Sequence, residues 1–229
     1  MSTAHHFFRE DGSVVEVCVT DRSDGDFHIA SDPARLRERR AEIMEGEWAA
    51  VRQVHGARVV DADPSSTPDA DALMTETPGQ PVAVQGADCA PIAFITDVGP
   101  VAVAHAGWRG LAAGVIEQTV QRLSERGATT RCAVVGPVIG PECYEFGSDD
   151  LAAVVAALGE EVRATTSHGS PALDLRAAIT NSFASSDVAD VRFVSGCTAC
   201  EGAGFSHRAR SERERHALVA RILPVEDHT

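Results

Sequence analysis

The stretch PIAFITDVGPVAVAH, residues 91–105, is the strongest fold signal in the sequence. Two runs of apolar and β-branched residues, Pro91–Thr96 and Val101–His105, flank the turn-forming residues 97–100, Asp-Val-Gly-Pro. Such runs favour β-strands, and the glycine and proline between them favour a short connection. The stretch therefore predicts a β-hairpin.

Further short strands are predicted on both sides of this hairpin. Each is a run in which β-branched residues recur and which ends near turn-forming residues. The predicted strands cover residues 14–20, 54–61, 82–85, 133–136, 191–195 and 217–223.

Helices are predicted between these strands. A capping residue followed by proline, Asp32-Pro33, predicts the start of a helix over residues 33–51. Apolar residues at helical spacing predict a second helix over residues 111–126. Two more helices are predicted over residues 148–158 and 174–183.

Strands and helices together predict the α/β (α+β) fold class. No linker, repeat or low-complexity tract divides the sequence, so we expect a single catalytic domain over residues 1–229. The expected architecture is a layered sandwich of mixed, largely antiparallel sheets covered by helices.

The charge balance restricts the chemistry. The chain has 34 acidic and 20 basic side chains, a net charge of −14, and all of the basic ones are arginine. Without lysine, the chain cannot form a Schiff base or use the lysine of a P-loop. Net acidity without a long arginine run argues against nucleic acid and anionic membranes as partners, and no protein partner is predicted.

From the sequence we expect neither a membrane span nor a signal peptide. No stretch approaches the ~20 apolar residues that cross a membrane, and the first ten residues lack the core of a signal peptide. We therefore expect a cytoplasmic protein. Its 6 cysteines are too few for a disulfide scaffold, which leaves the thiols for packing, metal binding or nucleophilic catalysis.

Three soft-metal ligands lie beside small residues at predicted turns or strand ends, namely His55, Cys89 and His105. Two imidazoles and one thiolate would leave tetrahedral zinc an open fourth position. Their spacing matches no local metal motif, and two alternatives stay open. Cys89 could be a nucleophile with His105 as its base and Asp88 assisting, or all three could serve only packing and hydrogen bonding.

Two other motifs are candidates for ligand binding. The motif GWRG, residues 107–110, precedes the predicted helix over residues 111–126, where Arg109 and the backbone amides could hold an anion. The alternative is a strand-to-helix corner anchored by Trp108. His207 is a candidate pocket residue because it adjoins an aromatic residue and an arginine.

The remaining cysteines predict packing. Cys197-Thr-Ala-Cys200 is a lone CxxC without a second CxxC or a thioredoxin-like setting, which favours a structural turn with Cys197 inside. Cys18, Cys132 and Cys143 are likewise predicted to be packed.

These motifs occur in the order of a known family. From about residue 14 to residue 223, the chain resembles the family known variously as polyphenol oxidoreductase (laccase-like), peptidoglycan editing factor, and purine nucleoside phosphorylase with adenosine deaminase activity. The motifs that carry the resemblance are QVHG at 53–56, DADAL at 69–73, ADC at 87–89, HAGWRG at 105–110, GPVIGP at 136–141, CYE at 143–145, CTAC at 197–200 and FSHR at 205–208.

The resemblance implies an α/β sandwich and a site. Its zinc ligands would be the three soft-metal candidates already named, and the family's arginine after the first strand would fall on Arg22. With Arg22, the candidate substrate-binding residues are Arg109 and Asp88. The chain departs from the family pattern where residues 23–28 replace a glycine-rich stretch. Two further departures are Glu142 in place of a cysteine and His207 in place of a tyrosine.

The resemblance also implies an activity, a zinc-dependent purine nucleoside phosphorylase for adenosine, inosine and methylthioadenosine that also deaminates adenosine. Phosphate, oriented by Arg22 and Arg109, would attack the ribose C1′, whereas deamination would use a zinc-activated water at the purine C6. Two alternatives remain. One is a cysteine hydrolase or peptidoglycan-editing amide hydrolase using Cys89 and His105, and the other is a copper polyphenol oxidoreductase (laccase) with Cu²⁺ in place of Zn²⁺.

Overall fold

The predicted hairpin lies at the centre of a six-stranded sheet. The computed structural model describes residues 2–223. Strands β7 (Ala90–Thr96) and β8 (Val101–Ala106) pair antiparallel, with Ala93 opposite Val103. The sheet has the order β12-β9-β7-β8-β5-β4, and its two outermost pairs are parallel. Its other strands are β12 (Asp190–Phe193), β9 (Thr130–Val135), β5 (Ala72–Thr75) and β4 (Val59–Asp61).

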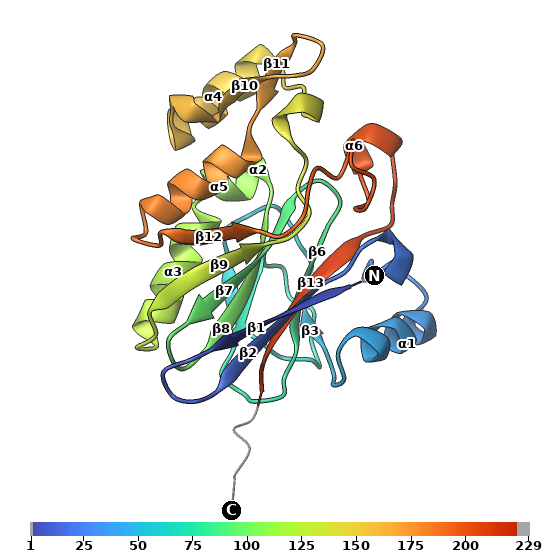
Figure 1. Cartoon of the computed structure of the whole chain (residues 1–229), viewed down its shortest axis with the longest axis vertical. Coiled ribbons are helices and arrows are strands. Elements are labelled where there is room, and N and C mark those ends of the chain that lie inside the picture. Colours follow the sequence, from blue (N-terminus) through green and yellow to red (C-terminus); the bar gives the residue numbers. More distant parts are fainter. Residues whose placement is uncertain (1, 224–229) are drawn as a thin grey trace, which may run out of the picture.

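A five-stranded sheet packs against the first one (Figure 1). Its order is β1-β2-β13-β6-β3, and only the β3–β6 pair is parallel. The facing sides of the two sheets share one apolar layer, in which Val17 and Leu218 from this sheet join Val103 and Val134 from the other. The strands are β1 (Thr3–Phe8), β2 (Val14–Val19), β13 (His216–Leu223), β6 (Val82–Gly86) and β3 (Ala49–Ala50).

Helices cover the outer faces of both sheets. Phe183 of α5 packs on Phe94 of the six-stranded sheet with ring centroids 5.3 Å apart, and Leu36 of α1 packs beside Val219 of the other sheet. The layers therefore run helix, sheet, sheet, helix, which confirms the predicted sandwich. The helices are α1 (Pro33–Ile43), α2 (Trp108–Ala112), α3 (Val115–Glu125), α4 (Ser148–Leu158), α5 (Leu175–Ala184) and α6 (His207–Arg210), with short 3-10 helices η1 (Arg22–Asp24), η2 (Pro141–Cys143) and η3 (Glu160–Val162).

Two helix predictions were wrong in their extent. The helix that begins at Pro33 ends at Ile43, because Gly46 takes a positive φ of 117° and Trp48 turns inward to stack on Phe27. The helix predicted over residues 111–126 is two helices, α2 and α3, separated at Gly114, whose φ is 83°. A left-handed residue interrupts a right-handed helix.

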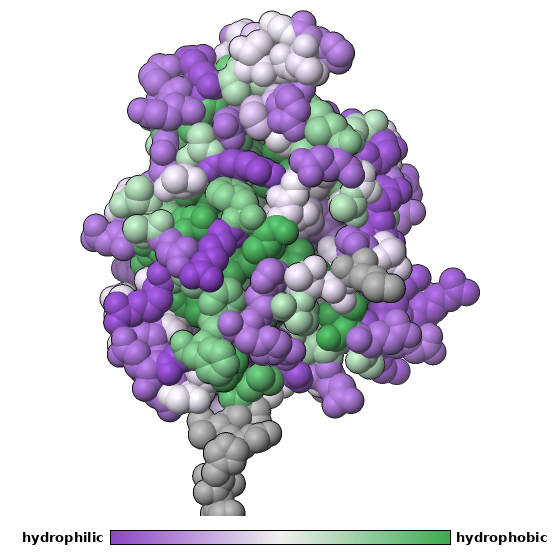
Figure 2. Space-filling view, viewed as in Figure 1, coloured by the Kyte–Doolittle hydropathy of each residue, from purple (hydrophilic) through white to green (hydrophobic). Residues whose placement is uncertain are grey.

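The predicted strand over residues 54–61 was also too long, since most of it is a loop and only β4 is strand. The prediction missed β1 and β5, and it missed the hairpin of β10 (Arg163–Thr165) and β11 (Pro171–Leu173). Within residues 2–223, no helix is long and apolar enough to cross a membrane. Figure 2 shows apolar side chains over the middle of one face, surrounded by polar ones.

Candidate functional site

The antiparallel hairpin brings two of the predicted ligands together. Ala90 at the start of β7 lies opposite Ala106 at the end of β8, and Pro91 lies opposite His105. Cys89 directly precedes β7, so its thiol lies at the same end of the sheet as the imidazole of His105. The loop that follows β3 brings His55 to this end as well.

The three side chains form a cluster of soft donors. One ligand atom from each of His55, Cys89 and His105 lies within 4.8 Å of the others, and Cys89 Sγ is 3.9 Å from His55 Nε2. His105 is buried, Cys89 is half-buried and His55 is exposed. A Cβ on Gly107 would lie 2.7 Å from Cys89 Sγ, so only glycine leaves room for the thiol. Donor type and convergence fit a three-ligand metal site that is open on one side.

The cluster is held from behind by the buried carboxylate of Asp71. Its Oδ1 lies 2.9 Å from His105 Nδ1, which leaves Nε2 of the ring for a metal. The same carboxylate accepts backbone N–H bonds from Val54, His55 and Gly56 at 3.2, 2.9 and 2.7 Å. A carboxylate that orients a ligating histidine is the usual outer support of a metal site.

The backbone of His55 is strained. Its φ is 60°, in the left-handed region that residues with a side chain rarely adopt. The hydrogen bonds from residues 54–56 to Asp71 compensate for this conformation. Strain that the surrounding structure maintains is typical of functional sites.

The ionisable groups of the site stabilise one another's charged forms. Burial would raise the pKa of the Cys89 thiol, but the nearby His105 and the hydrogen bonds to both histidines outweigh it and lower that pKa. Burial would lower the pKa of His105, but Cys89 and the hydrogen bond to Asp71 raise it. For Asp71, the hydrogen bonds outweigh burial and lower the pKa of the carboxyl group. The site therefore favours a thiolate, which is the form that binds metals.

The cluster opens into a cavity of about 630 Å³. Its wall carries three arginines, Arg52, Arg208 and Arg215, and the buried phenol of Tyr144. His207 also lines it, which confirms its prediction as a pocket residue. The remaining lining residues are His28, Ile29, Ala30, Val51, Gln53, Gln85, Gly86, Ala87 and Asp88, together with the three ligands.

Asp88 lines the cavity but is fully engaged by the protein. Its Oδ1 accepts from the Thr198 hydroxyl and its Oδ2 from the Arg208 backbone N–H, both at 2.6 Å. Its φ is 94°, a second strained position next to the cluster. Asp88 thus ties the Cys89 turn to the segment that carries Arg208.

The two arginines predicted to bind substrate lie elsewhere. Arg22 pairs with Glu212 and packs over the ring of Phe205, and Arg109 packs over Trp108 at 4.2 Å from the ring centroid. Neither lines the cavity. The cavity arginines were missed because nothing in the local sequence distinguishes them, although Arg208 adjoins His207 in a motif that was noted.

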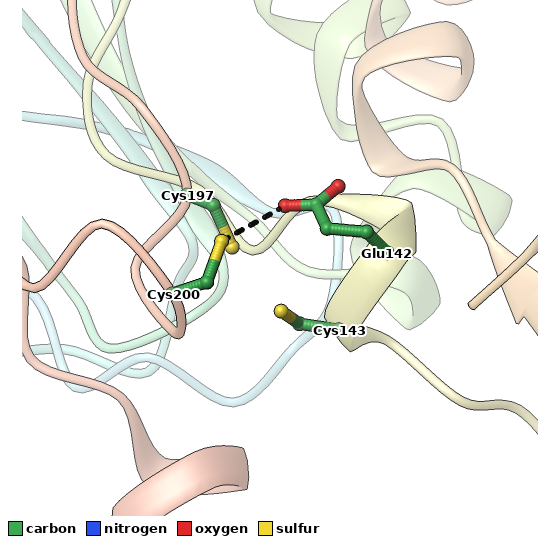
Figure 3. A group of neighbouring side chains, drawn as sticks. All are labelled: Glu142, Cys143, Cys197 and Cys200. Carbon is green, nitrogen blue, oxygen red and sulfur yellow. Dashed lines mark hydrogen bonds between the residues drawn. The ribbon is translucent and has the colours of Figure 1, made fainter. Parts of the chain in front are cut away.

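A second group of potential metal ligands lies apart from the first. Glu142 and Cys143 from η2 meet Cys197 and Cys200 from the CxxC turn, with ligand atoms within 4.8 Å of one another (Figure 3). Cys197 is buried as predicted, as are Cys18 and Cys132. Cys143 is half-buried and packs against the core, as predicted, and it also faces the CxxC turn, which the sequence did not indicate.

Several proteins resemble this chain in sequence. A purine nucleoside phosphorylase of Pseudomonas aeruginosa is 40% identical over 163 residues, which is 64% of this chain and 66% of that protein. One from Deinococcus radiodurans is 36% identical over 194 residues, 83% of this chain and 75% of that protein. The Escherichia coli purine nucleoside phosphorylase YfiH is 35% identical over 150 residues, and the match spans only 61% of its length.

Solved structures resemble the whole described fold. A protein of Neisseria meningitidis has a TM-score of 0.81 at 26% identity, over 97% of this chain and 99% of its own. YlmD from Geobacillus stearothermophilus has a TM-score of 0.77 at 26% identity, over 93% of both chains. The family described as multi-copper polyphenol oxidoreductase laccase matches residues 5–222, and the chain therefore belongs to this family.

Proposed function

We propose that the chain is a single catalytic domain that acts as a zinc-dependent purine nucleoside phosphorylase and also deaminates adenosine. The observation that carries the proposal is the cavity in which His55, Cys89 and His105 lie beside three arginines. The names of the relatives support the phosphorylase reaction. The proposed substrates are adenosine, inosine and methylthioadenosine, with inorganic phosphate as the second substrate of phosphorolysis.

The cavity suits a nucleoside and phosphate together. Its volume of about 630 Å³ lies within the ~300–1,000 Å³ typical of small-molecule sites. Part of its wall is rigid, because the Gln53 side-chain amide donates to the Gln85 carbonyl at 2.9 Å and accepts from the Gln85 backbone N–H at 2.8 Å. A preformed polar wall lowers the entropic cost of binding a small polar ligand.

The cavity arginines are the proposed phosphate ligands, in place of Arg22 and Arg109. Arg208 packs over Tyr144 at 4.7 Å and donates through Nη1 to the Glu145 carbonyl, and both contacts hold its guanidinium at the cavity wall. A guanidinium can bind two phosphate oxygens at once. In a protein with a net charge of −14, such local positive charge is needed to attract phosphate.

In the proposed phosphorolysis, a phosphate oxygen attacks the ribose C1′, the bond from C1′ to the purine nitrogen breaks, and its electron pair goes to the base. The leaving base needs a hydrogen-bond donor or a proton. Burial raises the pKa of Tyr144, so its phenol stays protonated and can donate such a bond. Zinc at the His55, Cys89 and His105 cluster would supply Lewis acidity and, for deamination, an activated water.

A second candidate function is supported by the spatial arrangement of Cys89, His105 and Asp71, in which the imidazole contacts both the thiol and the carboxylate. A thiolate, an imidazole and a carboxylate that contact one another in this way could also form the catalytic triad of a cysteine hydrolase. That chemistry does not need His55, whose strained conformation is nevertheless maintained. The third donor therefore favours the metal-dependent function.

Copper is the other alternative, because two histidines and a cysteine are also the donors of a blue-copper centre. A multi-copper centre needs further histidines close by. Within residues 2–223, His55 and His105 are the only histidines in the two clusters of potential metal ligands. We therefore propose zinc rather than copper.

Product analysis tests the reaction. The protein, with its metal content measured, is incubated with adenosine, inosine or methylthioadenosine, with and without phosphate. Free base that appears only with phosphate supports phosphorolysis, and inosine formed from adenosine supports deamination. No turnover of any nucleoside contradicts the proposal.

Variants of the cluster test the metal. We expect Cys89→Ala and His55→Ala each to lose bound zinc and at least about 100-fold in turnover, as expected when a group essential to catalysis is removed. Cys132→Ala, at a buried cysteine outside both clusters, is the matched control. A His55→Ala variant that keeps chelator-resistant activity, with covalent labelling of Cys89, would instead establish the cysteine hydrolase.

A further inference from the structure

The second cluster joins two segments that are far apart in the sequence. In Figure 3 the sulfurs of Cys143, Cys197 and Cys200 and the carboxylate of Glu142 point toward a common space. One ligand atom from each lies within 4.8 Å of the others, and Cys200 Sγ is 3.3 Å from Glu142 Oε1. The cluster shares no residue with the His55, Cys89 and His105 site.

Backbone hydrogen bonds hold part of this cluster in place. The Gly140 N–H donates to Cys197 Sγ at 3.1 Å, and such a bond stabilises a thiolate. A Cβ on Gly140 would clash with the Glu142 carboxylate, so only glycine at this position lets the carboxylate lie against the backbone. The Cys197 N–H in turn donates to Glu201 Oε1 at 2.9 Å, which fixes the start of the turn. Backbone contacts therefore fix the position of the Cys197 sulfur.

We propose that Glu142, Cys143, Cys197 and Cys200 bind one zinc ion as a closed structural site. Thiolates select zinc over the hard cations magnesium and calcium, and a carboxylate oxygen completes four donors. Zinc ligands lie about 2.0–2.3 Å from the metal, which places neighbouring donors roughly 3.5–3.8 Å apart in a tetrahedron. The observed spacing needs only small side-chain movements to reach this geometry.

A disulfide is the competing use of these cysteines. A bond between any two of them would leave the third thiol and the Glu142 carboxylate in the cluster without a common partner. Zinc gives all four donors one partner and places the carboxylate charge beside a cation. The convergence of four donors therefore favours the metal.

The proposed zinc would fix the wall of the catalytic cavity. Tyr144 follows Cys143 directly, and Thr198 lies between Cys197 and Cys200. Thr198 donates to Asp88, the neighbour of Cys89. A zinc ion that joins η2 to the CxxC turn would thus fix the positions of Tyr144 and Thr198, which line or support the cavity beside Cys89 and lie outside the β-sheets.

Metal content of the full chain tests this inference. The protein is purified under reducing conditions, loaded with zinc, gel-filtered and measured by plasma mass spectrometry together with its protein concentration. We expect two zinc ions per chain in the unaltered protein. Cys200→Ser and Glu142→Gln, both near the surface, should each lose one, and so should Cys89→Ala at the other site.

Cobalt distinguishes the two sites spectroscopically. In a Cys89→Ala background, Co²⁺ should still give the strong sulfur-to-cobalt absorption of a site with several thiolates, and Cys200→Ser should weaken it. Cys18→Ala, at a buried cysteine outside both clusters, should change neither readout. Unchanged zinc content in Cys200→Ser and Cys143→Ser, or a disulfide among these cysteines in the reduced and loaded protein, overturns the proposal. Neither readout uses nucleoside turnover, and the loss of one zinc ion in Cys200→Ser is measured relative to the unaltered protein, so this loss does not depend on the proposed function.

Discussion

At the scale of single residues, Asp71 connects the loop of His55 to the ring of His105. Its side chain is fully buried, and its two oxygens accept three backbone N–H bonds and contact one imidazole nitrogen. A buried carboxylate is costly unless such partners satisfy it. Asp71 is therefore a positioning residue that holds the proposed metal site rigid.

Replacing Asp71 with Asn tests this role. An amide offers one acceptor oxygen and an N–H₂ group that would face backbone donors, so both the loop and the His105 ring should lose orientation. We expect metal affinity to fall by about 10- to 100-fold, with turnover falling in parallel. Metal affinity is measured by competition with a chelator of known strength.

The matched control is Asp63→Asn, an exposed aspartate that caps a turn through Ser65 and Ser66. It should leave metal affinity unchanged. If Asp71→Asn binds metal as tightly as the unaltered protein, the positioning role is refuted. Circular dichroism of both variants shows whether the fold is retained.

The sequence allowed the three candidate metal ligands to be named, but it did not reveal what supports them. His55, Cys89 and His105 could be named because each is a soft ligand beside small residues in a motif of the family, and the structure brings their ligand atoms together. Asp71 carried no local signal of its role, because its partners come from segments elsewhere in the sequence. The grouping of Cys143 with the CxxC turn was missed for the same reason, since those residues meet only in the folded chain.

At the scale of elements, the start of α5 shows how a local signal specifies a helix. Asp174 accepts hydrogen bonds from the N–H groups of Arg176 and Ala177 at 2.9 and 3.0 Å. Helix starts leave such donors unsatisfied unless a side chain accepts them. The helix then packs Phe183 against the six-stranded sheet.

Asp174→Ala should therefore destabilise the protein by about 1 kcal/mol. Urea unfolding at neutral pH measures the change in the free energy of unfolding. Asp174→Ser, which can still accept one of the bonds, should recover most of the loss. Equal losses in both variants would mean that another property of Asp174, and not its capping bonds, stabilises the helix.

Elements with a strong local pattern were predicted well, including the central hairpin, β6, α5 and β13. The errors have tertiary causes. The apolar pattern continues past Ile43 because Trp48 is buried against Phe27, although α1 has already ended. Gly114 occurs within a helical pattern, and only its φ of 83° reveals the break between α2 and α3.

At the scale of the whole molecule, the cavity beside His55, Cys89 and His105 lies where the two sheets end together. His216 at the start of β13 pairs in register with Gly86 at the end of β6, close to the turn that carries Asp88 and Cys89. A Cβ on Gly86 would lie 2.8 Å from the His216 ring, so the residue is tightly enclosed. His216 is completely buried.

This burial makes the stability of the whole chain depend on pH. Burial lowers the pKa of His216 from 6.5 to about 4, although Asp88 opposes the shift and Arg215 adds to it. Between these values the unfolded chain binds a proton that the folded chain does not bind. Stability is therefore present at neutral pH and is lost as the pH falls through this range.

The pH dependence should be reduced when His216 is replaced. Between pH 7 and pH 5 this one residue should cost the folded state about 2 kcal/mol, because the unfolded chain gains the proton. The free energy of unfolding is measured with urea at pH 7 and at pH 5. The decrease between these two pH values should be about 2 kcal/mol smaller in His216→Leu than in the unaltered protein, whatever the stability of the variant at pH 7. His168→Leu, at an exposed turn, should keep the slope of the unaltered protein. If His216→Leu also keeps that slope, His216 is protonated in the folded protein, and its enclosure at the junction of the sheets does not control acid stability.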